Sequence, residues 1–195
     1  MRILLLILVV ILPCIVLATT ITVKQDGTGN YTLIQAAIEA ANNGDTVLVH
    51  PGTYVENINY IGKSISVCSL EAIAGDSTYI SRTIINGNRN GPCVAFLNAE
   101  QNASLRGFTL TNGTGYFTYS QFTQGGGVLI SNTYMTGSSI SLVNCNIHGN
   151  HAGMGVGVSS TNASLYLSGL NVHHNYGLES GGGILIVGSS TVVPS

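Results

Sequence analysis

The sequence predicts an all-β fold of the solenoid type, in which short strands stack in successive turns. The first observation is a glycine-rich pattern that occurs three times, at Gly125–Ile130, Gly153–Val158 and Gly181–Ile186. The second is an element between the copies, Ser141–Asn150, which recurs as Tyr166–Asn175. Internal repeats with a period of about 20–50 residues indicate a stacked architecture. Because these units are short, rich in β-branched residues and bounded by glycine or asparagine, they favour strands over helical repeats.

Apolar residues alternate with period two inside the repeats, as in strands with one buried face. Alignment of the copies at their first glycine gives two columns in the glycine-rich pattern: Val128, Val156 and Ile184, and Ile130, Val158 and Ile186. The second element gives two more: Phe108, Cys145 and Leu170, and Leu110, Ile147 and Val172. One turn cannot bury its apolar face alone. We therefore expect the members of each column to lie above one another.

The composition fits one exported domain with few charges. The chain has 195 residues, of which 45% are hydrophobic and only 7% are Asp, Glu, Lys or Arg, where an ordinary globular chain has about a quarter. The net charge of −2 gives no electrostatic reason to expect a nucleic acid partner. The surface must therefore consist mainly of neutral hydrogen-bonding groups.

The first residues resemble a signal peptide. Met1-Arg2 precedes an apolar run, Ile3–Leu17, and Val16-Leu17-Ala18 fits a cleavage site before Thr19. The run is shorter than the roughly 20 residues of a membrane span, so we expect residues 1–18 to be removed and the mature chain, 19–195, to have no membrane span. The predicted location is secreted, extracellular or at the cell surface. Cys68, Cys93 and Cys145 then remain, and their strand-like contexts predict buried small hydrophobic residues rather than disulfides or a metal site.

A capping helix is predicted ahead of the stacked turns. Residues 32–41 place Leu33, Ile34, Ala37 and Ile38 on one face, and Gly44 is placed to end the helix. We expect this helix to cover the open end of the solenoid, whose turns begin at about residue 45. The segment 45–50 is predicted as the first strand, 51–54 as a turn, and 55–60, 64–68, 82–86 and 93–97 as further strands. A longer polar loop is expected before Arg82.

The run from Ile21 through Val67 resembles the N-terminal cap and first turns of the pectin lyase-like superfamily of right-handed parallel β-helices. It includes Asp-Gly-Thr-Gly-Asn-Tyr, Ile-Gln-Ala-Ala-Ile and Gly-Asp-Thr-Val-Leu-Val. Gly52-Thr53-Tyr54-Val55-Glu56 is similar to a Gly-x-Tyr-x-Glu segment of pectin methylesterases. The resemblance implies a right-handed parallel β-helix and a pectin-like polysaccharide as ligand. It does not fix an activity, because many functions share one fold.

The resemblance also implies charged catalytic groups, namely two Asp and an Arg for the esterases, three Asp for the polygalacturonases, and calcium ligands with an Arg or Lys base for the lyases. Calcium is implied by the resemblance alone. From Gly107 to the end, Glu179 is the only Asp, Glu, Lys or Arg, whereas acid/base chemistry takes a pair of such groups. The catalytic residues are therefore unassigned, and the enzyme question stays open.

The best candidates for ligand contact are aromatic residues in an insertion between repeats, Tyr116–Gln124. Tyr116, Phe117, Tyr119 and Phe122 could stack on sugar rings, since variable loops of a solenoid are where binding surfaces form. The alternative is that these rings only pack the loop onto the strands. His148 and His173 occupy equivalent repeat positions, with His151 and His174 near, and are expected to form an outward ladder about 4.8 Å apart rather than a metal site. Asn150 and Asn175 are expected to hydrogen-bond along the stack.

Two functions follow from these patterns. The first is a secreted or surface-exposed β-helix that binds a polysaccharide or cell-surface glycan and, in a longer parent protein, processes it. The second is a non-catalytic adhesin or structural surface protein, similar to the repeat domains of bacterial surface proteins. No capping element follows the last repeat, which predicts the N-terminal part of a longer solenoid, and self-association through the open turn if the chain ends there.

Overall fold

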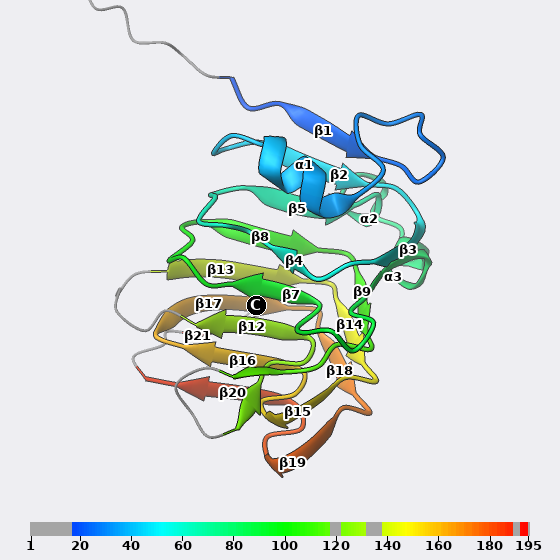
Figure 1. Cartoon of the computed structure of the whole chain (residues 1–195). Coiled ribbons are helices and arrows are strands. Elements are labelled where there is room, and N and C mark those ends of the chain that lie inside the picture. The colour runs from blue at the N-terminus through cyan, green and yellow to red at the C-terminus, as the bar shows by residue number, and fades with distance from the viewer. Residues whose placement is uncertain (1–16, 118–121, 132–137, 189–191, 195) are drawn as a thin grey trace, which may run out of the picture.

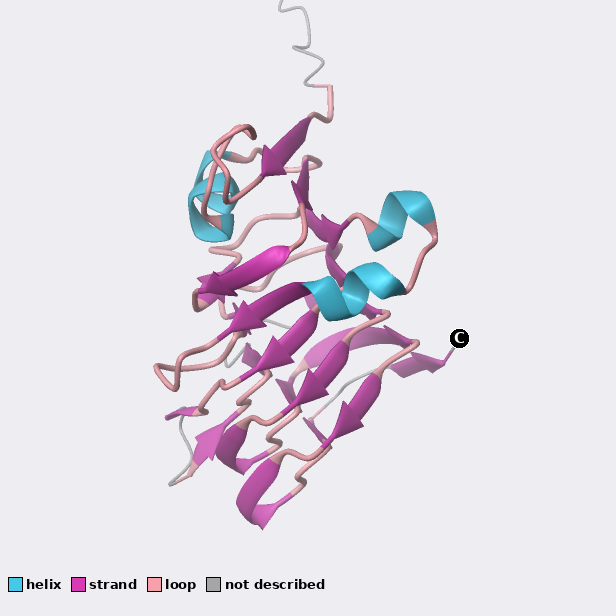
Figure 2. Cartoon of the chain, turned by 90° about the vertical axis from the view of Figure 1, so that its right-hand side faces the viewer, coloured by secondary structure: helices cyan, strands magenta, loops and turns pink. Residues whose placement is uncertain are grey.

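A computed structural model describes residues 17–117, 122–131, 138–188 and 192–194. The protein is mostly β, with several parallel sheets. Among the described strands every neighbouring pair is parallel except β10 and β11. Figures 1 and 2 show the strands stacked one below another, with the helices near the N-terminal end.

The strands form four sheets, named A to D here. Sheet A contains, in spatial order, β1 (Thr20–Val23), β2 (Thr46–Val49), β5 (Ser66–Ser69), β8 (Ala103–Arg106), β13 (Ser138–Val143), β17 (Ala163–Ser168) and β21 (Val192–Pro194). Sheet B contains β3 (Gly52–Val55), β6 (Thr83–Asn86), β9 (Thr109–Thr111), β14 (Asn146–His148) and β18 (Asn171–His173). Sheet C contains β4 (Ile58–Asn59), β7 (Val94–Phe96), β12 (Val128–Ser131), β16 (Val158–Thr161) and β20 (Ile184–Val187). Sheet D contains β10 (Tyr116–Phe117), β11 (Thr123–Gln124), β15 (His151–Met154) and β19 (Tyr176–Ser180).

From β12 onward the chain visits the sheets in a fixed order. It passes from sheet C to A, B and D, and then returns to C beside the strand that it left. Strands that are neighbours in a sheet therefore come from successive sequence repeats. The predicted columns of the second element are confirmed, because Leu110 and Val172 both pair with Ile147.

The register predicted for the glycine-rich copies is wrong in the middle copy. Val128 pairs with Val158, not Val156, and Val158 in turn pairs with Ile184. The matching corner glycines, all with positive φ, are Gly125, Gly155 and Gly181. The two-residue shift keeps the same side chains inside, because side-chain direction alternates with period two.

The shift places Ser160 between the buried Ile130 and the partly buried Ile186. Ser160 pairs with Ile130 on one side and Ile186 on the other, and its hydroxyl is buried without a hydrogen-bond partner among the described residues. An alignment by hydrophobicity prefers Val158 in that column, which explains the error. A separate one-residue irregularity in the pairing of β15 with β19 lies between Ala152 and Met154.

The core fills the space between the sheets with one apolar residue above another. In sheet A the column runs through Val47, Val67, Leu105, Leu142 and Leu167. In sheet B it runs through Tyr54, Ile85, Leu110, Ile147 and Val172. Most of these residues are buried in one hydrophobic cluster. Burial of apolar area is the main force that holds such strands together.

Left-handed corners explain why glycine and asparagine recur in the sequence. The corner between sheets A and B carries Gly107, Asn144 and Gly169, with φ of 83°, 50° and 60°. Asparagine and glycine tolerate this conformation better than other residues. The repeat pattern therefore records the positions at which the chain turns from one sheet to the next.

The predicted capping helix is present as α1 (Ile34–Ala40), but it is shorter than residues 32–41. Glu56 accepts hydrogen bonds from the backbone N–H groups of Ile34 and Gln35, both at 2.9 Å. Leu33 lies before this point and is 54% exposed. The helix ends ahead of Gly44, whose φ of 92° belongs to the following turn.

Helix α1 covers only part of the N-terminal end. It packs against β1, β2 and β4, and β1 pairs with β2. The first strand of sheet A is therefore β1, at Thr20–Val23, and not the segment that begins at residue 45 as predicted. Lys63 donates from Nζ to three carbonyl oxygens at the C-terminal end of α1, those of Ile38, Glu39 and Ala41, where a positive charge is favourable.

Three further sequence predictions are corrected. The expected turn at 51–54 is strand β3, and the expected strand 55–60 is reduced to β4, because the chain turns a corner between them. The expected polar loop before Arg82 contains two short helices, α2 (Glu71–Ala74) and α3 (Thr78–Arg82). None of the described helices is long and apolar enough to cross a membrane.

The residues that carry the family resemblance have structural roles in this region. The buried Tyr54 hydroxyl donates to the carbonyl oxygen of His50 at 2.9 Å, and Glu56 caps α1. The Gly-x-Tyr-x-Glu segment thus fixes β3 and α1 relative to each other. The segment therefore has a structural role, and its presence in the sequence indicates a fold and does not indicate an activity.

Candidate functional site

A groove on sheet D is the best candidate for a ligand site. It has a volume of about 570 Å³, within the range of about 300–1,000 Å³ typical of small-ligand sites. Its lining comes from the strand ends of three successive repeats: Thr114, Gly115, Thr123, His151, Ala152, Tyr176, Gly177 and Leu178. The lining contains two hydroxyl side chains, an imidazole and a phenol ring, but no Asp, Glu, Lys or Arg.

The groove is built on one column of the repeat. Thr114 pairs with His151, and His151 pairs with Tyr176. The rings of His151 and Tyr176 are stacked, with centroids 5.2 Å apart and an interplanar angle of 18°. Tyr176 is 61% exposed and lies on β19, the edge strand of sheet D.

Tyr116, Phe117 and Phe122, three of the predicted aromatic residues, adjoin this groove in the chain but do not form its lining. Tyr116 and Phe117 are exposed on β10. Strand β10 pairs with β11, whose Gln124 pairs with Met154 of β15. The insertion is therefore a hairpin that extends sheet D beside the groove. Tyr119 lies outside the described residues.

Phe122 fits the packing alternative better than the other aromatic residues. It is 39% exposed, and a Cβ built on Gly153 would come within 2.8 Å of the Phe122 Cβ. Phe122 thus packs closely over the glycine in β15. Tyr116 and Phe117 have the greater exposure and remain the candidates for ligand contact.

Sequence reasoning missed Tyr176 and Leu178, and it placed His151 near the histidine ladder and not in this groove. The aligned elements Ser141–Asn150 and Tyr166–Asn175 end one residue before His151 and Tyr176. Extending the alignment by that residue would have placed these two rings on adjacent strands. The exposure of Leu178, at 89%, had no comparable signal in the sequence.

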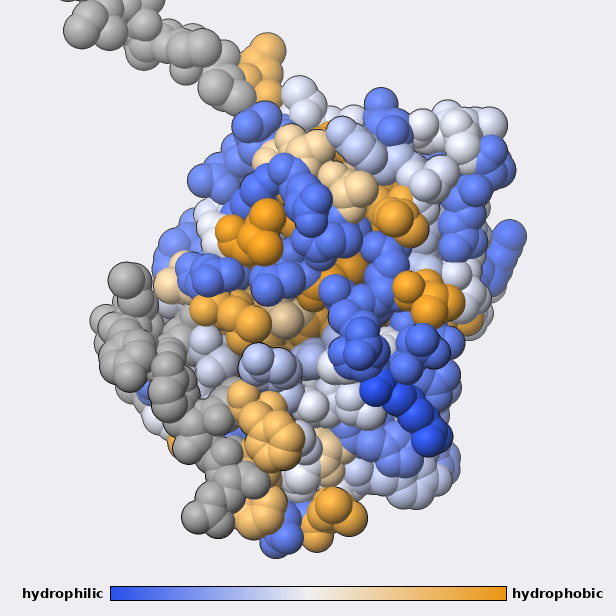
Figure 3. All heavy atoms as spheres, viewed as in Figure 1, coloured by the Kyte–Doolittle hydropathy of each residue, from blue (hydrophilic) through white to orange (hydrophobic). Residues whose placement is uncertain are grey.

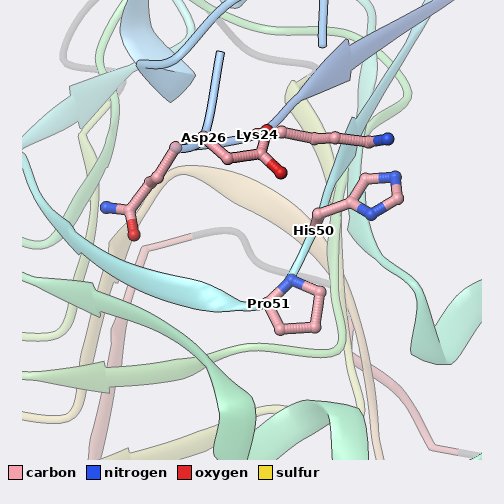
Figure 4. A pocket seen from close by; sticks show the side chains of 5 residues that line it. Lys24, Asp26, His50 and Pro51 are labelled. Carbon is pink, nitrogen blue, oxygen red and sulfur yellow. The ribbon is translucent and has the colours of Figure 1, made fainter. Parts of the chain in front are cut away.

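A second, more polar pocket lies near the N-terminal end, with a volume of about 350 Å³. It is lined by Lys24, Gln25, Asp26, His50 and Pro51. Figure 4 shows the Lys24 and His50 side chains extending to the same side. Burial and the positive charge of Lys24 lower the pKa of His50, against the opposing charge of Asp26.

Two polar side chains of this pocket are engaged in local structure. The Asp26 carboxylate accepts from the backbone N–H and hydroxyl of Thr28, which lower its pKa. The Gln25 side-chain amide donates to the Thr53 carbonyl oxygen at 2.8 Å. These hydrogen bonds hold the local backbone in place, so the Asp26 and Gln25 side chains already have partners. We therefore favour the groove on sheet D as the ligand site.

The predicted pairing of His148 with His173 on sheet B is confirmed, whereas His151 lies on sheet D, stacked on Tyr176. His148 and His173 pair in register, and their rings stack with centroids 5.1 Å apart. His173 lies 2.6 Å from His174 between Nδ1 atoms and 3.0 Å from the Asn146 side-chain oxygen at Nε2. The pKa of His148 is lowered, first by burial and then by its two histidine neighbours. Within the described ranges no group of three or more His, Cys, Asp or Glu is placed to bind a metal ion.

The three cysteines are free and buried, as predicted. Burial raises the pKa of Cys93 to about 12 and those of Cys68 and Cys145 to about 11. Thiolate is the reactive form, so these thiols are suited to packing. The Cys93 Sγ lies 3.2 Å from the Thr111 carbonyl oxygen.

A buried carboxylate links three repeats at the corner between sheets A and B. Glu71 is 5% exposed at its side chain and forms an ion pair with Arg106, with Oε2 at 2.9 Å from Nε. The side-chain amide of Asn144, in the next repeat, donates to Glu71 Oε1 at 2.8 Å. The hydrogen bond from Arg106, followed by that from Asn144, lowers the pKa of Glu71 against the cost of burial.

We expect Glu71→Gln to destabilise the protein in a pH-dependent manner. A lowered pKa stabilises the fold fully above the ordinary value of 4.5, and this contribution is lost as pH falls through the lowered pKa. The variant should lose about 1–2 kcal/mol of unfolding free energy at pH 7, and the gap to the wild type should close toward pH 3. Urea unfolding at a series of pH values measures this, and a gap that does not change with pH would contradict it.

Comparison with known proteins gives no assignment, since no protein-family model and no curated protein matches the chain.

Proposed function

We propose that this chain is a right-handed parallel β-helix of the pectin lyase-like type, and that its groove on sheet D binds polysaccharide. The fixed visiting order of sheets C, A, B and D supports such a winding. The resemblance of residues 21–67 to the superfamily supports the family and the pectin-like ligand class. The signal-like segment 1–18 supports a secreted or cell-surface location.

One observation carries the ligand proposal, namely the exposed His151–Tyr176 ring stack on the groove wall. Aromatic rings offer a large flat apolar face, which matches the C–H face of a sugar ring. The hydroxyl groups of Thr114 and Thr123 accept hydrogen bonds from the backbone N–H groups of Gly91 and Gly153, and their own hydrogens can be donated to sugar hydroxyls. Figure 3 shows a mostly polar surface with separate apolar patches, as expected for a ligand that is itself mostly hydroxyl-bearing.

Binding, not catalysis, is proposed for this groove. Its lining has neither a carboxylate nor a Lys or Arg, and general acid/base chemistry on a glycosidic bond uses such groups. Processing of the polysaccharide is not proposed for this groove.

The second candidate is a non-catalytic adhesin or structural surface protein. The repeats after Gly107 favour this second candidate, because they contain a single charged residue, Glu179. It differs from the first candidate in predicting no measurable affinity of the groove for free polysaccharides.

We expect Tyr176→Ala to weaken polysaccharide binding by about tenfold or more, equivalent to about 1.4 kcal/mol. The substitution removes the exposed ring of the stack and leaves the backbone pairing of β19 unchanged. Affinity electrophoresis in gels containing pectin, xylan or hydroxyethyl cellulose would measure the change. Tyr166→Ala is the matched control, because Tyr166 is a partly exposed tyrosine on β17 of sheet A. If the gel retards both variants equally, the groove is not the polysaccharide-binding site. If the gel does not retard the wild type, the result favours the non-catalytic adhesin or structural protein.

A further inference from the structure

The charges of this molecule are distributed unevenly along the stack. All six Lys and Arg residues precede Gly107, and Glu179 is the one Asp, Glu, Lys or Arg after it. The lining of the groove runs from Thr114 to Leu178 and therefore falls wholly in the neutral part of the chain.

The backbone of Arg89 lies beside one end of the groove, and Glu179 follows the lining residues at the other end. At one end, the backbone N–H of Arg89 donates to the Asn112 carbonyl oxygen at 2.7 Å, and Thr114 bonds to Gly91 in the same turn. At the other end, the exposed Glu179 follows the lining residue Leu178 in β19. Glu179 lies three residues from Tyr176 along β19, about 10 Å at the usual strand rise, so its charge reaches the groove when the ionic strength is low.

A polyuronate would gain little from this arrangement. A bound segment carries a carboxylate on each sugar, and the groove crosses three strands, about 10 Å, which is the length of a disaccharide unit. The groove lining contains no Lys or Arg, and the negative charge of Glu179 repels an anion at one end. Carboxylates that leave water without a partner lose solvation that nothing replaces.

We infer that the groove selects uncharged glycans, including fully esterified ones, over polyuronates of the same backbone. This inference rests on the proposed function and narrows its ligand class. The hydroxyl groups, the imidazole and the phenol of the lining supply neutral hydrogen bonds, and the ring stack supplies the apolar face. Polyuronates bind less tightly because the lining has no Lys or Arg to pair with their carboxylates, and because Glu179 repels those carboxylates.

The test uses polysaccharides that differ in charge alone. Dissociation constants are measured at low ionic strength for methyl-esterified pectin and the same pectin after de-esterification, and for hydroxyethyl and carboxymethyl cellulose. We expect the neutral member of a pair to bind at least tenfold more tightly. The Glu179→Gln substitution should reduce the ratio of the two dissociation constants, anionic over neutral, two- to threefold. Higher salt should reduce this ratio in the same way.

Glu39→Gln is the matched control, because Glu39 is an exposed residue of α1 and its replacement changes the net charge equally. It should leave the ratio unchanged. Equal or tighter binding of the anionic member by the wild type would overturn the charge selection while glycan binding stands. Absence of binding to both members of both pairs would instead contradict the proposed function.

Discussion

Replacement of Asn150 by leucine should cost about 3 kcal/mol or more of unfolding free energy. Asn150 is fully buried, and its side-chain oxygen accepts from the backbone N–H of Gly113 at 2.8 Å. Its amide donates to the carbonyl oxygens of Leu110 and His148 and to the side-chain oxygen of Asn175. A buried polar group left without a partner costs about 1–3 kcal/mol, and leucine leaves several such groups.

The measurement is chemical unfolding followed by circular dichroism, with Asn175→Leu as the control. Asn175 is the equivalent residue of the next repeat, but it is only half-buried, and water reaches its partners more easily. We expect Asn150→Leu to cost at least twice as much as Asn175→Leu. Similar losses at both positions would show that the hydrogen bonds, and not burial, carry the effect; a loss below about 1 kcal/mol at Asn150 would contradict the prediction.

Gly113→Ala should destabilise the protein by about 2–3 kcal/mol, because the backbone has no room for a methyl group there. A Cβ built on Gly113 would overlap the carbonyl oxygen of Gly126 and lie 2.8 Å from the Cys93 Sγ. Both neighbours belong to the close approach between consecutive repeats, where Cys93 donates from its backbone N–H to the Gly126 carbonyl. The repeat spacing must therefore increase locally to admit the side chain.

Gly183→Ala provides the control for Gly113→Ala. A Cβ built on Gly183 meets no heavy atom within 4 Å, so the change should stay within about 0.5 kcal/mol. Thermal unfolding of both variants compares the two sites. Equal effects would mean that chain entropy, common to every glycine replacement, outweighs the steric contact.

The ligand site shows how far the sequence alone could lead. The insertion Tyr116–Gln124 was found by its break in the repeat, and its exposed rings on β10 lie beside the groove. The stack of His151 on Tyr176 was missed because the two rings belong to segments that looked like corners. Only the pairing of β15 with β19 brings them face to face.

Charge provides a similar contrast. The sequence shows which residues are charged, but it does not show their partners. Glu71 and Arg106 are 35 positions apart and have no recognisable spacing, yet the short helix α2 turns Glu71 toward Arg106. Asp45 likewise accepts from the backbone N–H groups of Asn42, three positions away, and of Thr19, 26 positions away.

The sequence by itself determined the parallel stacking, the columns of the second element and the neutral surface. These follow from period-two alternation and from residues that tolerate left-handed corners, both of which are local properties of the chain. The tertiary structure decided the register of the middle glycine-rich copy and the position of the groove. Register depends on how a whole strand fits its neighbours, and a two-residue slip keeps the same faces buried, so hydrophobicity could not distinguish Val156 from Val158 as the partner of Val128.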